Sequence, residues 1–149
     1  MNWQQDKSIK LSRFCVYCFT VVLVAICIFA PYIFTLLINA RGESLTKLPM
    51  FLISVYTSAI PAAAVLFGLH KLLKNIDDDK VFIQENVSIL RRLSWYCIIA
   101  GAIYGISILY YLPFLILCIP IAFIGLILRV VKNIFAEAVR IKNENDYTI

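Results

Sequence analysis

The stretch LSWYCIIAGAIYGISILYYLPFLILCIPIAFIGLIL, residues 93–128, contains no charged residue. A helix needs about 20 apolar residues to cross the ~30 Å hydrocarbon core of a bilayer, so this stretch is too long for one crossing and must fold back on itself. The sequence YYLP at 110–113 predicts the turn, because tyrosine favours the membrane interface and proline favours the first turn of a helix. Two membrane spans are therefore expected, at about 93–111 and 113–132.

Two further uncharged stretches occur earlier in the chain and predict spans at 14–40 and 48–70. With 62% hydrophobic and 15% charged residues, a chain of 149 residues has more apolar surface than a soluble domain of this length can bury. Helices satisfy their own backbone hydrogen bonds in lipid, and the short alternating segments of a β-barrel are missing from the pattern. The sequence thus predicts an all-α fold, a single domain of four transmembrane helices in a bundle, with the lipid bilayer around it.

The positive charges predict the orientation of the chain. All 14 Lys and Arg residues except Arg41 and Lys47 fall before the first span, between the second and third spans, or around the end of the fourth. Lys and Arg are enriched on the cytoplasmic side of membrane proteins, so both termini are expected in the cytoplasm. Cleavage of the first span as a signal peptide is not expected, because its apolar stretch is longer than that of a signal peptide.

Two cytoplasmic segments follow from this topology, a loop at 71–92 and a tail at 133–149. In the loop, DDD at 77–79 predicts a turn, after which helical spacing of apolar residues predicts a helix that runs into the third span. These two segments are polar on one side and apolar on the other, which is typical of amphipathic helices.

The tail carries an apolar stripe at helical spacing, beside a polar face on which Glu137, Arg140 and Glu144 are spaced for ion pairs. The stripe consists of Val131, Ile134, Phe135, Ala138 and Ile141. It could cover headgroup lipid, the mid-chain helix or a partner protein. The favoured prediction is a plain extension of the fourth span that packs on the mid-chain helix, and docking of a partner is compatible with that extension.

No residue pattern indicates catalysis, a cofactor or a metal. A nucleotide-binding loop, paired catalytic carboxylates, a Ser-His-Asp set and zinc spacing are all missing from the sequence. The mixed charges of the loop and tail offer no basic patch for nucleic acid. CVYC at 15–18 has the spacing of a redox motif, but its place in an apolar helix favours packing. The chain is expected not to be an enzyme.

Small residues and prolines mark the spans. GAIYG at 101–105 is a Gly-x-x-x-Gly pattern, which lets helix backbones approach closely. Packing inside the bundle is the favoured interpretation, and a homo-oligomer formed through Gly101 and Gly105 is the alternative. Pro31, Pro61 and Pro120 lie inside spans and are expected to kink them.

Two motifs carry a resemblance to a known family. Residues 81–91 match Val-Phe-x-x-Glu-Asn-Val-x-x-Leu-Arg, and residues 144–149 match Glu-Asn-Asp-Leu-Thr-Ile with Tyr147 in place of leucine. In these motifs the chain resembles an uncharacterised family of bacterial four-helix membrane proteins, a domain of unknown function. The resemblance covers essentially the whole chain and implies a bacterial cell membrane. Genes of this family often neighbour a small helix-turn-helix regulator, which implies a cytoplasmic regulator as partner and no catalytic residues.

These observations predict a non-enzymatic membrane protein whose loop and C-terminal helix dock a cytoplasmic partner, with a helix-turn-helix regulator as the candidate. The alternative is a small transporter, or an immunity protein against a membrane-active peptide or toxin, in which the kinks surround a cavity. The predicted partner-binding residues are Phe82, Glu85, Asn86, Arg91, Phe135, Glu137, Arg140, Glu144 and Asn145.

Overall fold

The computed structural model describes residues 3–42 and 44–146, and in this part of the chain every regular element is a helix. The elements are α1 (Trp3–Ala40), η1 (Leu45–Lys47), α2 (Leu48–Asp77), α3 (Gln84–Ser107), η2 (Leu112–Phe114) and α4 (Leu115–Asp146). Each of the 4 α-helices contains a stretch long and apolar enough to cross a membrane. The chain is a multi-pass membrane protein with an all-α fold, which confirms the fold class predicted from the sequence.

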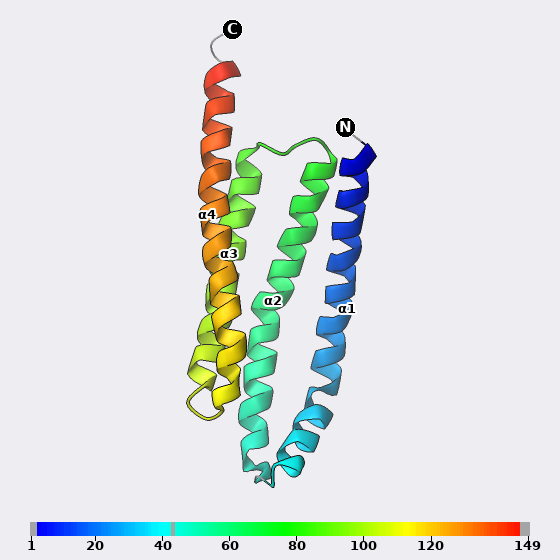
Figure 1. The fold of residues 1–149 in the computed structure, drawn as a ribbon, viewed down its shortest axis with the longest axis vertical. Helices are drawn as coiled ribbons and strands as arrows, with labels where there is room; N and C mark the ends of the chain where they lie inside the picture. The colour runs from blue at the N-terminus through cyan, green and yellow to red at the C-terminus, as the bar shows by residue number, and fades with distance from the viewer. Residues whose placement is uncertain (1–2, 43, 147–149) are drawn as a thin grey trace.

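The helices form an antiparallel series in which each α-helix packs on the next one along the chain (Figure 1). Among the described residues, no Cα atom of α1 comes within 8 Å of α4. Both ends of the described chain and the α2–α3 turn lie together, opposite the α1–α2 and α3–α4 connections (Figure 1). We call the end with residues 3–13, 70–92 and 129–146 the charged end, because it holds all 14 Lys and Arg residues except Arg41 and Lys47.

The long uncharged stretch folds back where the sequence predicts a turn. α3 ends at Ser107, η2 contains Pro113, and α4 begins at Leu115. An aromatic cluster closes this end of the molecule around the buried ring of Phe51, which lies 5.1 Å from the ring of Phe34 and 4.9 Å from that of Tyr111. Aromatic pairs at such distances add to the hydrophobic contact, so the cluster holds the two hairpins together.

Polar side chains join α2 to α3 within the apolar region. The hydroxyl oxygens of Ser54 and Ser107 lie 2.7 Å apart, and Ser58 donates a hydrogen bond to the hydroxyl of Tyr104 at 2.8 Å. Ser54 also donates to the carbonyl of Met50 in its own helix at 3.2 Å. A hydroxyl in a helix commonly donates to a carbonyl one turn back in this way, whereas the hydrogen bonds between helices fix how α2 and α3 align.

Small residues bring α3 and α4 together. A Cβ atom placed on Gly101 would lie 3.4 Å from Ala122, and one on Gly105 would lie 3.6 Å from the sulfur of Cys118. Ser94 donates a hydrogen bond to the carbonyl of Gly125 at 2.9 Å. The Gly-x-x-x-Gly pattern is therefore used for packing inside the chain, where Gly101 is buried and Gly105 is partly covered.

Pro31 lies inside α1, and a hydroxyl from α2 supplies the hydrogen bond that the proline removes. Proline has no N–H, so the carbonyl of Cys27 lacks its usual helical donor. The hydroxyl of Tyr56 donates to that carbonyl at 3.2 Å. Figure 1 shows the second half of α1 bending towards α2, so the two helices stay in contact across the proline.

Candidate docking surface at the charged end

The turn between α2 and α3 is built around the side chain of Asn86, which is 0% exposed. Its amide nitrogen donates hydrogen bonds of 2.8 Å to the carbonyls of Lys80 and Val81. Its side-chain oxygen accepts a 2.8 Å hydrogen bond from the amide of Asn75. One buried side chain thus satisfies backbone groups that the turn leaves open. Asn86 has no exposed surface, so it positions the neighbouring residues rather than touching a partner itself.

The chain begins this turn with aspartates, as the sequence predicts. α2 ends at Asp77, and Asp79 has a φ of 59°, the left-handed conformation that Asp tolerates better than most residues. The carboxylate of Asp77 lies 2.8 Å from the guanidinium of Arg13, which ties α1 to the end of α2. The acidic run therefore shapes the turn and pairs with α1.

Glu85 faces Lys71 across the same turn. The Nζ atom of Lys71 lies 2.7 Å from a carboxylate oxygen of Glu85, and both side chains are nearly half exposed. The hydrogen bond and charge of Lys71 hold the pKa of Glu85 below its usual value. This ion pair fixes the first turn of α3 against α2 and leaves the carboxylate accessible from the charged end.

Phe82 and Phe135 connect the α2–α3 turn to α4. Their ring centroids lie 5.9 Å apart. Phe135 also packs on a buried cluster formed by Ile89, Leu90 and Leu93 of α3. Phe82 is 46% exposed, so this aromatic pair contacts the core through Phe135 and is accessible from outside through Phe82.

α4 continues past the α2–α3 turn as one helix (Figure 1). Val139 is still buried, but every side chain of residues 140–145 is exposed. The last turns of α4 therefore lie beyond the other helices. The prediction of a plain extension of the fourth span that packs on the mid-chain helix is confirmed. The tip of that extension, residues 140–145, is not covered by the other helices.

The apolar stripe of the tail divides between two faces of α4. Val131 and Phe135 pack against the buried cluster of α3, whereas Ile134 is 62% and Ile141 49% exposed. Only part of the stripe is therefore used within the chain. Ile134 and Ile141 lie about two helical turns apart, so they share one open face.

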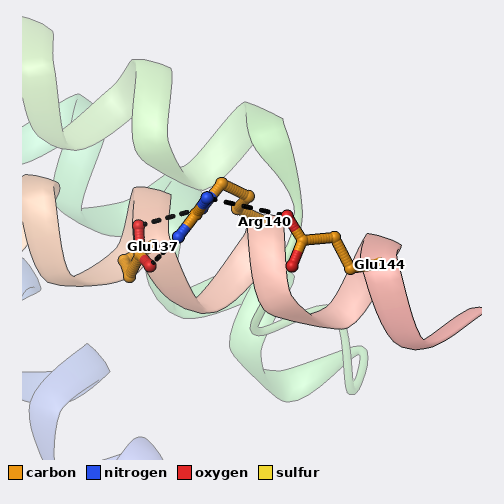
Figure 2. A network of polar contacts seen from close by, with 3 residues as sticks. All are labelled: Glu137, Arg140 and Glu144. Carbon is orange, nitrogen blue, oxygen red and sulfur yellow. Dashed lines mark hydrogen bonds and ion pairs between the residues drawn. The ribbon is translucent and has the colours of Figure 1, made fainter.

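Glu137, Arg140 and Glu144 form a chain of ion pairs along α4 (Figure 2). The Nε atom of Arg140 donates to Glu137 at 3.2 Å, and its Nη1 atom lies 3.6 Å from Glu144. This confirms the pairing predicted from the spacing. The hydrogen bond from Arg140 lowers the pKa of Glu137, and the same bond raises the pKa of Arg140. All three side chains are more than half exposed, so the pairs contribute little to stability and remain open to a partner.

The remaining predicted residues, Arg91 and Asn145, are both exposed. The structure brings Phe82, Glu85 and Phe135 close to the α2–α3 turn and places Arg140, Glu144 and Asn145 on the tip of α4. Sequence reasoning missed Asn75, although its hydrogen bond holds Asn86 in place. Its position in the polar segment before DDD is the only signal of that role.

An apolar cavity of about 310 Å³ lies between the helices at mid-span. α1 contributes Leu23, α2 the buried Pro61, α3 Cys97 and Ala100, and α4 Ile121. Pro31 and Pro120 do not line it, and both are exposed. The cavity exists because α1 packs on α2 without reaching α4.

Among residues 3–42 and 44–146, His, Cys, Asp and Glu side chains form no group of three or more that could hold a metal ion. Cys15 and Cys18 are free thiols on the exposed face of α1, so the expectation that they pack is wrong for this pair. Cys97 and Cys118 do pack, at the contact between α3 and α4.

Comparison with known proteins agrees with the resemblance found in the motifs. A family model described as protein of unknown function (DUF2975) matches residues 10–149, a range that includes most of α1, all of α2, α3 and α4, and both motifs. No curated protein and no solved structure matches the chain. Since the family model covers nearly the whole sequence, the chain belongs to the family of proteins of unknown function DUF2975.

Proposed function

We propose that this chain is a non-enzymatic protein of the bacterial cell membrane whose charged end lies in the cytoplasm and docks a small helix-turn-helix transcriptional regulator. The distribution of Lys and Arg supports the orientation, since only Arg41 and Lys47 of the 14 lie at the opposite end. The resemblance stated above supports the kind of partner, because genes for such regulators often neighbour genes of the family.

The observation that carries the proposal is the overhang of α4. Residues 140–145 are exposed beyond the α2–α3 turn, and the open face of the helix bears Ile134 and Ile141. At about 1.5 Å per residue, Ile141 lies roughly 18 Å past Arg129, which is the first charged residue after the uncharged stretch of α4. The headgroup region of one leaflet is only about 5–8 Å thick, so lipid does not cover Ile141 when α4 follows the membrane normal. A protein surface is the better cover for this side chain.

The chemistry of this face suits a helix of a partner protein. Exposed apolar side chains repeat along one side, and Glu137, Arg140 and Glu144 lie beside them. An amphipathic helix binds such a surface by placing its apolar residues on the stripe and its charges on the flanks. The two signs of charge alternate, so the face does not attract a phosphate backbone.

Docking at the membrane would act on gene expression through the free concentration of the regulator. A regulator held at the charged end is removed from the cytoplasmic pool, and its release raises that pool. Phe82 and Phe135 link the docking face to the α2–α3 turn, and the turn is held by Asn86. A change in the packing of the membrane helices therefore alters the surface that the regulator meets.

The test is co-purification of the regulator with the full chain after crosslinking in intact membranes. We expect the pair Ile134→Ser and Ile141→Ser to reduce recovery of the regulator at least about tenfold, because two apolar contacts of about 1–2 kcal/mol each are lost. Lys142→Ser, a change at another exposed position of the same helix, is the control and should leave recovery unchanged. Deletion of residues 136–149 should release the regulator while the protein stays in the membrane. Undiminished recovery with either the double variant or the deletion refutes the proposal.

A second candidate function, a small transporter or an immunity protein against a membrane-active peptide or toxin, is supported by the mid-span cavity. Its volume of about 310 Å³ and its apolar lining suit an apolar guest. Replacing Ala100 by Phe would occupy part of this cavity. Hypersensitivity or altered uptake in cells with this variant, combined with no effect of deleting residues 136–149, would favour the second function over docking.

A further inference from the structure

A groove between α2 and α3 opens at the border between the uncharged stretches and the charged end. Its volume is about 200 Å³. Lys71 of α2 and Arg92 of α3 line it together with apolar side chains, among them Phe67 and Leu93. Gly68 lets Leu93 close the floor, because a Cβ atom at that position would lie 2.7 Å from a methyl group of Leu93.

Three features place this groove at the level of lipid headgroups. Lys71 is the first charged residue after the uncharged stretch of α2, and Arg92 is the last one before that of α3. On the next turn of α3, the ring of Trp95 lies 5.1 Å from the guanidinium of Arg129. Tryptophan concentrates at the interface between hydrocarbon and water, so the groove lies at the same depth.

The charges of the groove are only partly balanced within the protein, because the two cations share Glu85, which pairs with Lys71 and acts on Arg92 from farther away. Lys71 pairs with Glu85 at 2.7 Å, which satisfies one of the two cations. The ion pairs found among the described residues leave Arg92 without a carboxylate within 4.0 Å, and its side chain is exposed. A guanidinium in this position can hold two phosphate oxygens at once through parallel N–H bonds.

We propose that this groove binds one anionic phospholipid. The headgroup phosphate lies on Arg92, with Lys71 beside it, and an acyl chain lies along the exposed ring of Phe67. The apolar floor below the cations explains why a lipid fits better than a free anion, since a free anion gains nothing from Phe67 and Leu93. Basic pockets between transmembrane helices at this depth are typical sites for anionic headgroups. This site is separate from the face of Ile134 and Ile141 and does not depend on a regulator.

The test uses the full chain, purified in a non-ionic detergent. Its thermal unfolding is followed while short-chain phosphatidylglycerol, short-chain phosphatidylcholine or inorganic phosphate is added. We expect phosphatidylglycerol to raise the unfolding midpoint in a saturable way, and the other two to have at most a small effect. Arg92→Gln should weaken the apparent affinity for phosphatidylglycerol at least about tenfold. The control Arg91→Gln changes an exposed arginine that does not line the groove and should leave the affinity unchanged.

Each other outcome overturns the inference. An equal response to inorganic phosphate would mean a free-anion site, and an equal response to phosphatidylcholine would mean that charge is not recognised. Equal losses in Arg91→Gln and Arg92→Gln would mean diffuse attraction to a basic surface. If Arg92→Gln does not fold, the wild-type protein is mixed with equimolar phosphatidylglycerol and phosphatidylcholine and examined by native mass spectrometry. Failure to retain phosphatidylglycerol in preference to phosphatidylcholine overturns the proposed site. Regulator recovery is measured separately, so loss of one proposal leaves the other standing.

Discussion

The amide nitrogen of Asn75 donates a 2.8 Å hydrogen bond to the side-chain oxygen of Asn86, joining the last turns of α2 to the first turn of α3. Asn86 in turn caps the carbonyls of Lys80 and Val81. The asparagine of the motif at 81–91 thus acts from within the turn, and the exposed residues of the motif, Phe82, Glu85 and Arg91, contribute to the surface.

Replacing Asn86 by Ala should destabilise the protein. The change removes the donor of two part-buried backbone carbonyls, which costs about 1–3 kcal/mol for each group left unsatisfied, and it leaves the Asn75 amide with only its 3.4 Å hydrogen bond to Glu85. Unfolding in denaturant, followed by circular dichroism in detergent, measures the loss. Gln84→Ala, two positions earlier and exposed, is the matched control and should change stability by less than about 0.5 kcal/mol. Similar stabilities of the two variants would show that the turn does not depend on Asn86.

Tyr56→Phe should weaken the contact between α1 and α2. The variant keeps the ring but removes the donor that satisfies the Cys27 carbonyl below Pro31. The expected cost is about 0.5–1.5 kcal/mol in the same unfolding measurement. Tyr32→Phe removes an exposed hydroxyl next to the proline and should have no effect. A cost for Tyr32→Phe as large as that for Tyr56→Phe would contradict the role given to Tyr56.

Gly125→Leu should disrupt the packing of α3 on α4. Even a Cβ atom at this position would lie 3.2 Å from Cys97 and 3.3 Å from the carbonyl oxygen of Ser94, so a longer side chain forces the helices apart. Gly105→Ala is the control, because its new methyl group would meet nothing closer than 3.6 Å. We expect a lower melting temperature for the first variant and an unchanged or higher one for the second.

Loss of dimeric species with intact folding in Gly105→Ala would instead support a homo-oligomer through this glycine.

The ion pairs on α4 predict a pH dependence that is local. The folded pKa of Glu137 is lowered by Arg140, so the pair is present above the usual pKa of a glutamate and is lost as the pH falls through the lowered value. Carbon-13 NMR of the side-chain carboxyl should show Glu137 titrating below the range of an ordinary glutamate. Arg140→Ala should move the midpoint upward without changing the global stability, because the pair is exposed. A midpoint that does not respond to Arg140→Ala would rule out the interaction in solution.

Several features of the fold could be predicted from the sequence because they depend on composition and on local spacing. The absence of charge over 93–128 requires a turn, and YYLP supplies it at the place where α3 gives way to η2. Likewise, spacing along one helix suffices to pair Arg140 with both Glu137 and Glu144. The helix that runs from the mid-chain loop into the third span was also predictable, since its apolar period continues into the uncharged stretch.

Features that depend on contacts between distant segments were not predictable. Nothing in the sequence separates Phe135, which packs on α3, from Ile134, which faces outward, because a single apolar stripe is wide enough to include both. The repeated Glu-Asn pairs also look alike in sequence, yet Asn86 is buried in a turn and Asn145 is exposed on a helix end. The separation of α1 from α4 likewise depends on tertiary packing, which no local sequence pattern predicts.

The docking proposal rests on the orientation of the chain, and a pair of reporters tests that orientation. A reporter that is active only in the cytoplasm is fused after Ile149, and in a second protein it is inserted at Gly42, where the loop between α1 and α2 has open space around the glycine. We expect activity for the fusion after Ile149 and none for the insertion at Gly42. Activity at Gly42, or no activity after Ile149 in a stably inserted protein, would place the charged end outside the cytoplasm and contradict the proposed orientation.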